Sequence, residues 1–161
     1  MKKIFQYLVL ASLFISCQED VKFNTPALQG MKDDVIWRAI NAKATLDANG
    51  GLTIIGNTSN EKLTLKTNST IPQTYFLGTS DSKKVIFEKV DNGETIIFST
   101  GFGIGDGQII ITEYDMINNT VSGTFKFNAE NSYNNPMAGP VLRFQQGVFY
   151  KVPVTSSALI N

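Results

Sequence analysis

The chain has 161 residues, with 14 lysines and arginines against 14 aspartates and glutamates, so its formal net charge at pH 7 is zero. This balance gives no basis for electrostatic attraction to nucleic acid, and we expect no nucleic-acid partner. The chain has no histidine and one cysteine, Cys17. This composition excludes an internal disulfide and leaves a cysteine nucleophile without its usual histidine base.

The first 16 residues have the features of an export signal. Met1, Lys2 and Lys3 form a short basic start, and residues 4–16 are almost all apolar or small. This run is too short for a transmembrane helix, which needs about 20 apolar residues. We therefore expect residues 1–16 to be a cleaved signal peptide.

The small residue Ser16 directly precedes Cys17, and this arrangement resembles the lipobox of bacterial lipoproteins. In those proteins the cysteine thiol receives a diacylglycerol and the cysteine becomes the first residue of the mature chain. The resemblance therefore implies lipidation of Cys17 and membrane attachment, for which two lipid signals already suffice. The following Gln18–Glu19–Asp20 resembles the acidic tags of surface-exported lipoproteins, which points to the outer face of the outer membrane.

Residues 17–26 are expected to form a polar tether that ends at Pro26, and residues 27–161 a single domain. In this domain apolar side chains alternate with polar ones, which is typical of β-strands with one buried face. The clearest strand is 121–129. Residues 36–46 show the same alternation, with Ile36, Ile40, Ala42, Ala44 and Leu46 on one face. Shorter strands are expected at 52–56, 62–66, 74–77, 85–90, 95–100, 108–114 and 147–154.

Turn residues separate these strands. Asn49–Gly50–Gly51 and Asp91–Asn92–Gly93 supply the positive φ angles that tight hairpins need, and residues 116–119 are expected to form a four-residue hairpin loop. With no 3.6-residue period after the signal, this pattern predicts an all-β fold, an antiparallel β-sandwich or β-barrel of about eight to ten strands. Alternation does not decide between the two.

The ordered segments of this domain resemble a family of small bacterial lipoproteins with an all-β domain that is known only as a domain of unknown function. The resemblance covers most of residues 27–154 and implies an exported, lipid-anchored β domain, with no catalytic residues carried over. The family tends to have a glycine turn before the tryptophan, where this chain has Asp33–Asp34, so we expect a differently shaped first hairpin. The segments are VIWRA (35–39), LTIIG (52–56), LTL (63–65), QTYFLG (73–78), GQIIITEYD (107–115), NNTVSGTFKFNA (118–129) and QGVF (146–149).

The glycine-rich stretch GFGIGDG (101–107) does not have the spacing of a phosphate-binding G-x-G-x-x-G loop, and a strand rather than a helix follows it. We expect these glycines to form a tight bend between two strands, or a bulge.

Glu113 and Asp115 alternate onto one face of a strand, and a glycosidase needs two carboxyl groups about 5 to 9 Å apart. Acids at the end of a strand are more often solvated, and Asp115 is expected to cap the 116–119 turn. An envelope hydrolase using Glu113 and Asp115 is therefore the least favoured alternative.

Asp33–Asp34, Asp91–Asn92 and Asp106 offer oxygen ligands but do not have the spacing of a calcium loop. We predict neither a metal site nor a cofactor.

Strand positions favour a place in the core or at its rim for Trp37, Tyr75, Tyr114 and Tyr150. Tyr133 is the exception, because it lies in the polar stretch 131–140 together with Asn134 and Asn135. Irregular segments of this length often carry functional surfaces. We therefore predict Tyr133, Asn134 and Asn135 as the ligand-binding residues.

These observations favour a lipid-anchored cell-envelope protein with a non-enzymatic β-rich binding or structural domain. Its expected partners are the membrane, through the N-terminal lipid, and an envelope protein or a glycan. The alternative is a lipoprotein that binds a glycan or a small hydrophobic ligand, at a barrel mouth or at the 131–140 loop.

Overall fold

A computed structural model describes residues 27–156, so the predicted signal peptide, Cys17 and the tether lie outside the described residues. Within this range the predicted all-β fold is confirmed, with eleven strands against the eight to ten that we expected. No helix in this range has the length and apolarity of a transmembrane span. The strands are β1 (Ala27–Lys32), β2 (Val35–Arg38), β3 (Asn41–Leu46), β4 (Leu52–Asn57), β5 (Glu61–Thr67), β6 (Thr74–Leu77), β7 (Lys84–Asp91), β8 (Glu94–Ser99), β9 (Asp106–Asp115), β10 (Thr120–Asn131) and β11 (Val141–Ser156).

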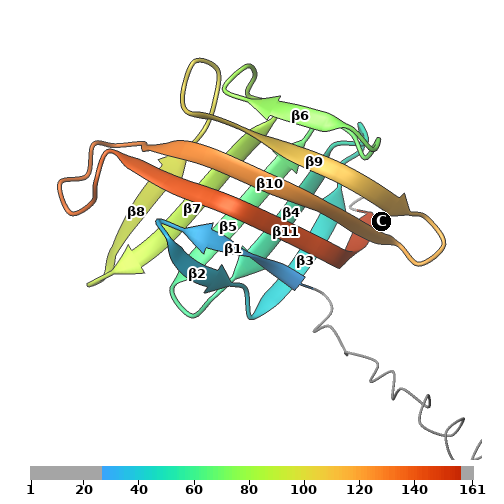
Figure 1. Ribbon diagram of the computed structural model, residues 1–161, viewed down its shortest axis with the longest axis horizontal. Helices are drawn as coiled ribbons and strands as arrows, with labels where there is room; N and C mark the ends of the chain where they lie inside the picture. The colour runs from blue at the N-terminus through green and yellow to red at the C-terminus, as the bar shows by residue number, and fades with distance from the viewer. Residues whose placement is uncertain (1–26, 157–161) are drawn as a thin grey trace, which may run out of the picture.

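The strands form two layers that cross each other steeply (Figure 1). The front layer has the strand order β6-β9-β10-β11-β1-β2, and the back layer has the order β3-β4-β5-β7-β8. Orthogonal packing of this kind needs strands that pass from one sheet to the other at the corners.

Two long strands make these corners. β10 pairs with β9 along most of its length and then with β8 at Glu130 and Asn131. β11 pairs with β10, and its last residues, Val154 to Ser156, run parallel to β3. Seven strands therefore form a closed hydrogen-bonded ring, and the fold combines features of the predicted sandwich and barrel.

Most of the predicted turns are confirmed. Asn92 and Gly93 have φ angles of 49° and 85° and join β7 to β8, and Gly50 has a φ of 81° between β3 and β4. The first hairpin turns at Asp33 and Asp34, with φ angles of 45° and 64°. Positive φ at both central positions is the geometry of a type I′ turn, which aspartate adopts here in place of glycine.

The prediction of one continuous strand over residues 36–46 is wrong. The chain leaves the front layer after β2 and enters the back layer with β3: the amide of Ala39 donates to Leu28 O, and the amide of Ile40 to Asn57 O. The change of layer breaks the alternation. Trp37 consequently faces the core at 4% exposure, whereas Ile36 and Ile40 are 78% and 77% exposed.

The space between the layers is filled by aliphatic and aromatic side chains. Phe144, which is fully buried, lies at the centre of an aromatic cluster. Its ring centroid is 5.2 Å from that of Phe127, 5.4 Å from that of Phe125 and 5.6 Å from that of Trp37. This packing gives no support to a ligand site inside the fold.

Candidate functional site

The predicted binding loop, residues 131–140, joins β10 to β11 at one end of the molecule (Figure 1). Tyr133 is 76% exposed and Asn134 has a φ of 49°. Asn135 holds the loop together. Its backbone amide donates to Asn131 Oδ1, and its side-chain Oδ1 accepts from the backbone amide of Met137. Of the three predicted residues, Tyr133 and Asn134 therefore remain on the surface.

Asp115 caps the β9–β10 turn, as predicted. Its Oδ1 accepts hydrogen bonds from the amides of Ile117 and Asn118 at 2.9 and 3.0 Å, and its Oδ2 accepts one from Asn118 Nδ2 at 2.6 Å. These bonds, above all the one from the Asn118 side chain, lower the pKa of Asp115. Glu113 is exposed on β9. The carboxylate of Asp115 thus serves the turn.

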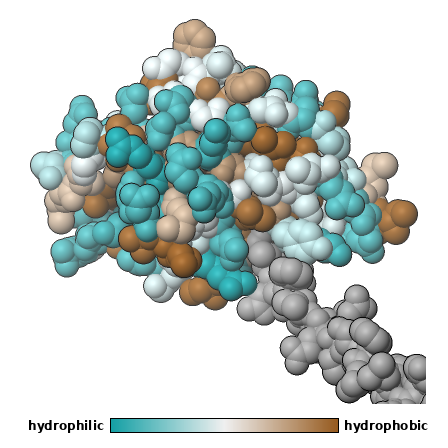
Figure 2. Space-filling model, viewed as in Figure 1, coloured by the Kyte–Doolittle hydropathy of each residue, from teal (hydrophilic) through white to brown (hydrophobic). Residues whose placement is uncertain are grey.

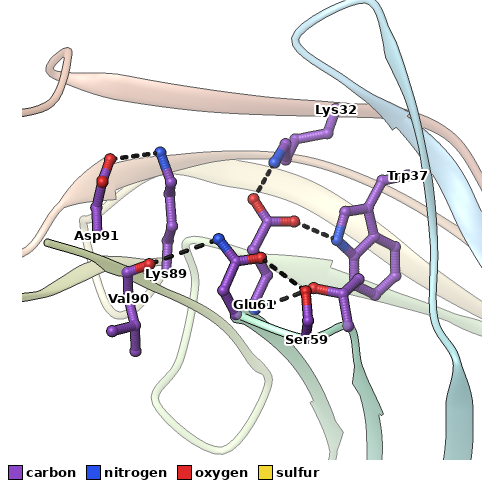
Figure 3. A network of polar contacts seen from close by, with 9 residues as sticks. Lys32, Trp37, Ser59, Glu61, Lys89, Val90 and Asp91 are labelled. Carbon is purple, nitrogen blue, oxygen red and sulfur yellow. Dashed lines mark hydrogen bonds and ion pairs between the residues drawn. The ribbon is translucent and has the colours of Figure 1, made fainter. Parts of the chain in front are cut away.

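A polar network that sequence reasoning missed lies between the two layers (Figure 3). Glu61 of β5 accepts from Lys32 Nζ at one oxygen and from Trp37 Nε1, at 2.7 Å, at the other. The Glu61 side chain is 10% exposed and that of Lys32 is 22% exposed. The Lys32 ammonium also lies 5.2 Å from the ring centroid of Phe87. Because both carboxylate oxygens are engaged, the network ties the layers together.

The outer face of the front layer carries a bulge at Gln146. The β10–β11 register shifts between Phe125 and Phe127, and the β1–β11 register between Gln29 and Met31. Gln146 takes up both shifts with a φ of 51°. A bulge inserts an extra residue and re-aims its side chain, and bulges are frequent beside functional sites. The side chain of Gln146 is exposed on this face.

Two shallow hollows meet at Gln146. One has a volume of about 350 Å³ and the other about 380 Å³. The first is lined by Gln108, Thr124, Phe125, Lys126, Gln146, Gly147 and Val148. The second is lined by Gln29, Gly30, Met31, Ile36, Arg38 and Gln146. We call this surface the Gln146 face.

Strand register places these residues in rows. Ile110, Thr124 and Val148 are neighbours across β9, β10 and β11. Gln108 pairs with Lys126 in the next row, and Met31 pairs with Ile36 beyond the bulge. Figure 2, which views this side, shows polar side chains interspersed with apolar ones.

The Gln146 face offers three carboxamides, two cations and several aliphatic side chains. Each carboxamide supplies both donors and an acceptor, and the cations, Lys126 and Arg38, supply donors only. Apolar surface with a few convergent polar groups is the usual make-up of a small-ligand site. A ligand that lies flat across strands and presents hydroxyl groups matches this set.

Within residues 27–156, no group of three or more Cys, Asp or Glu side chains is placed to hold a metal ion. The glycine-rich segment 101–107 forms the expected bend, with φ angles of 70° at Gly103 and 62° at Gly105, and an isolated bridge between Gly101 and Ile104.

Comparison with known proteins identifies the family but no characterised relative. Residues 24–153 match a protein-family model that is described as a domain of unknown function. No curated protein matches the chain, and no solved structure does. The resemblance to an uncharacterised family is thereby confirmed, whereas the lipoprotein character that it implied stays a prediction.

Proposed function

The chain belongs to the DUF6252 family, and from this premise we propose that it is a non-enzymatic binding domain of the cell envelope. In this proposal a lipid on Cys17 holds the domain at the outer membrane, on the face that is exposed at the cell surface. Support for the anchor comes from the basic start, the short apolar run and the small residue before the single cysteine. These are the features of an export signal rather than of a membrane span.

The observation that carries the binding proposal is the meeting of two hollows at the Gln146 bulge. Its polar groups come from β1, β2, β9, β10 and β11, so the backbone hydrogen bonds of a sheet fix the spacing of the residues that carry them. Because the backbone is already ordered, binding there has to order side chains only. The ligand class we propose is a glycan, whose hydroxyl groups pair with carboxamides and whose ring faces pack on aliphatic side chains.

A hydrophobic ligand inside the fold has less support. The core contains the cluster around Phe144, and every side-chain polar atom that is buried in the described range has a hydrogen-bond partner. A ligand entering there would have to displace packed aromatic rings. The outer face needs no such rearrangement.

A glycan array probed with the full lipidated chain in detergent tests the binding proposal. Gln146→Gly removes the side chain and suits the positive φ, so we expect it to keep the fold and to lose the array signal. Tyr133→Ala is the matched control in the 131–140 loop and should bind as the wild type does. The reverse result places the site in that loop, and a blank array contradicts the glycan proposal.

Palmitate labelling in growing cells tests the anchor separately. We expect the wild-type chain to incorporate labelled palmitate and Cys17→Ala to incorporate none. Incorporation that survives Cys17→Ala contradicts lipidation at this residue, whatever the glycan array shows.

A further inference from the structure

The β9–β10 hairpin carries two adjacent apolar side chains at its tip. Met116 is 76% exposed and Ile117 is 92% exposed. No other large hydrophobic residue in the described range has as high an exposed fraction as Ile117. In Figure 1 the hairpin extends beyond the rest of the front layer at one end of the molecule.

The fold does not need apolar residues at these positions. The turn is held by the Asp115 carboxylate and the side chain of Asn118, and it closes at Asn119 with a φ of 50°. Neither Met116 nor Ile117 belongs to the hydrophobic core. Single exposed apolar side chains are common, but an adjacent pair on a projecting hairpin is suited to contact with an apolar partner.

The chain that precedes the domain enters at this same end. Ala27 pairs with Tyr150, and Thr120 at the base of the hairpin pairs with Pro153, three residues further along β11. These positions are about 10 Å apart along the strand, and two strand spacings add about 10 Å across it. Residues 17–26 span up to about 33 Å when extended. A lipid on Cys17 therefore brings a bilayer within reach of the hairpin tip.

We propose that Met116 and Ile117 insert into the surface of the membrane that holds the lipid anchor, an inference that rests on the anchor in the proposed function. Two side chains bind a bilayer weakly by themselves. The anchor makes the contact intramolecular, so the effective concentration of membrane is high. Residues 116–119 carry no charge, and the adjacent Asp115 carboxylate is engaged by three hydrogen bonds within the turn. The nearby exposed Lys151 offsets its charge and suits anionic headgroups. This contact would set the orientation of the domain, with the 131–140 loop pointing away from the bilayer.

Site-specific labelling tests the contact, because a lipidated Cys17 leaves no other thiol in the chain. The full chain with Ile117→Cys is labelled with the fluorophore NBD and reconstituted in vesicles of phosphatidylethanolamine and phosphatidylglycerol. Tyr133→Cys, in the 131–140 loop, is the matched control. We expect emission at 117 to shift to shorter wavelength and dithionite to reduce that label several-fold more slowly than the label at 133. Met116→Cys should behave as Ile117→Cys does.

The outcomes separate the contact from the anchor. If the chain does not float with the vesicles, the anchor fails and this inference fails with it. If the chain floats but the labels at 117 and 133 react equally fast, the contact alone is overturned. If the label at 117 is shielded in a Cys17→Ala chain in a solution that contains no vesicles, the occupant is a second copy of the protein. This result also overturns the membrane contact.

Discussion

The indole nitrogen of Trp37 donates a 2.7 Å hydrogen bond to Oε2 of Glu61, and the two residues come from different layers of the fold. The other oxygen of Glu61 accepts from Lys32 on β1 (Figure 3). One carboxylate thus joins β1 and β2 to β5. Because the Glu61 side chain is only 10% exposed, its loss would leave two poorly solvated donors without a partner.

Glu61→Ala is therefore expected to lower the free energy of unfolding by about 3 kcal/mol, because it removes one partner of a mostly buried ion pair. Glu61→Gln should lose less, because its amide oxygen still accepts from Trp37. Urea unfolding measures both values. Glu113→Ala, at an exposed position, is the control, and a loss as large as that of Glu61→Ala there would refute this account.

Gly123→Ala is expected to destabilise the domain severely. A Cβ at residue 123 would lie 2.0 Å from Ile110 O and 2.3 Å from Cζ of Phe149. The first atom belongs to the backbone of a paired strand and the second to a fully buried ring. We expect a loss of about 3 kcal/mol or more, at the upper end of overpacking costs. Gly139→Ala, where no atom lies within 4 Å of the new Cβ, should unfold as the wild type does. Thermal melting of the two variants side by side checks the contrast.

Asp34→Gly is expected to stabilise the first hairpin. Asp34 has a φ of 64°, a left-handed conformation that glycine adopts without steric cost. The gain should be about 0.5 kcal/mol, because the greater freedom of glycine in the unfolded chain offsets part of the relief. Asp33 should be kept, since its Oδ1 accepts from the amide of Arg143. A lower midpoint of urea unfolding in Asp34→Gly would contradict the expectation.

Asp115 is expected to give the domain a pH-dependent stabilising contribution. The hydrogen bond from the Asn118 side chain is the main cause that lowers its pKa below the ordinary 3.8. A carboxyl group whose folded-state pKa is lowered stabilises the domain at pH values above its ordinary pKa of 3.8. This stabilisation is lost as the pH falls through the folded-state pKa. The difference in unfolding free energy between the wild type and Asp115→Ala should therefore shrink in acid.

NMR titration of the Asp115 carboxyl checks the cause. In Asn118→Ala the pKa of Asp115 should rise towards its ordinary value, because the largest contribution to the shift is gone. An unchanged pKa in that variant would mean that the backbone amides alone hold the carboxylate.

The sequence pattern predicted the strands whose alternation is uninterrupted. In β10 the side chains of Val121, Phe125 and Phe127 face the core as expected, and residues 74–77 coincide with β6. β1 was missed, because its inward positions include Gly30 and Lys32, which give no apolar alternation. The inward-facing Lys32 is paired with Glu61, and that partner is distant in sequence.

The Gln146 face could not be predicted, because it depends on strand order. Gln29, Gln108 and Gln146 are far apart in sequence and become neighbours only when β1 and β10 pair with the two sides of β11. The bulge also falls at a glutamine with positive φ, where residue type gives no signal. The 131–140 loop was predicted correctly as a loop, but the internal role of Asn135 depends on a hydrogen bond that composition does not reveal.

The parallel pairing of Val154 with Ala44 has a consequence for when the protein folds. This pairing closes the ring with two segments that are 110 positions apart in the chain, and β11 also completes the pairing of β1 and β10. Contacts of such high sequence separation form slowly, because the loop-closure entropy must be overcome first. During synthesis the nascent chain lacks this closing strand until residue 156 has emerged from the ribosome. A chain bound for export would thus stay unfolded, and competent for translocation, until β11 has been made.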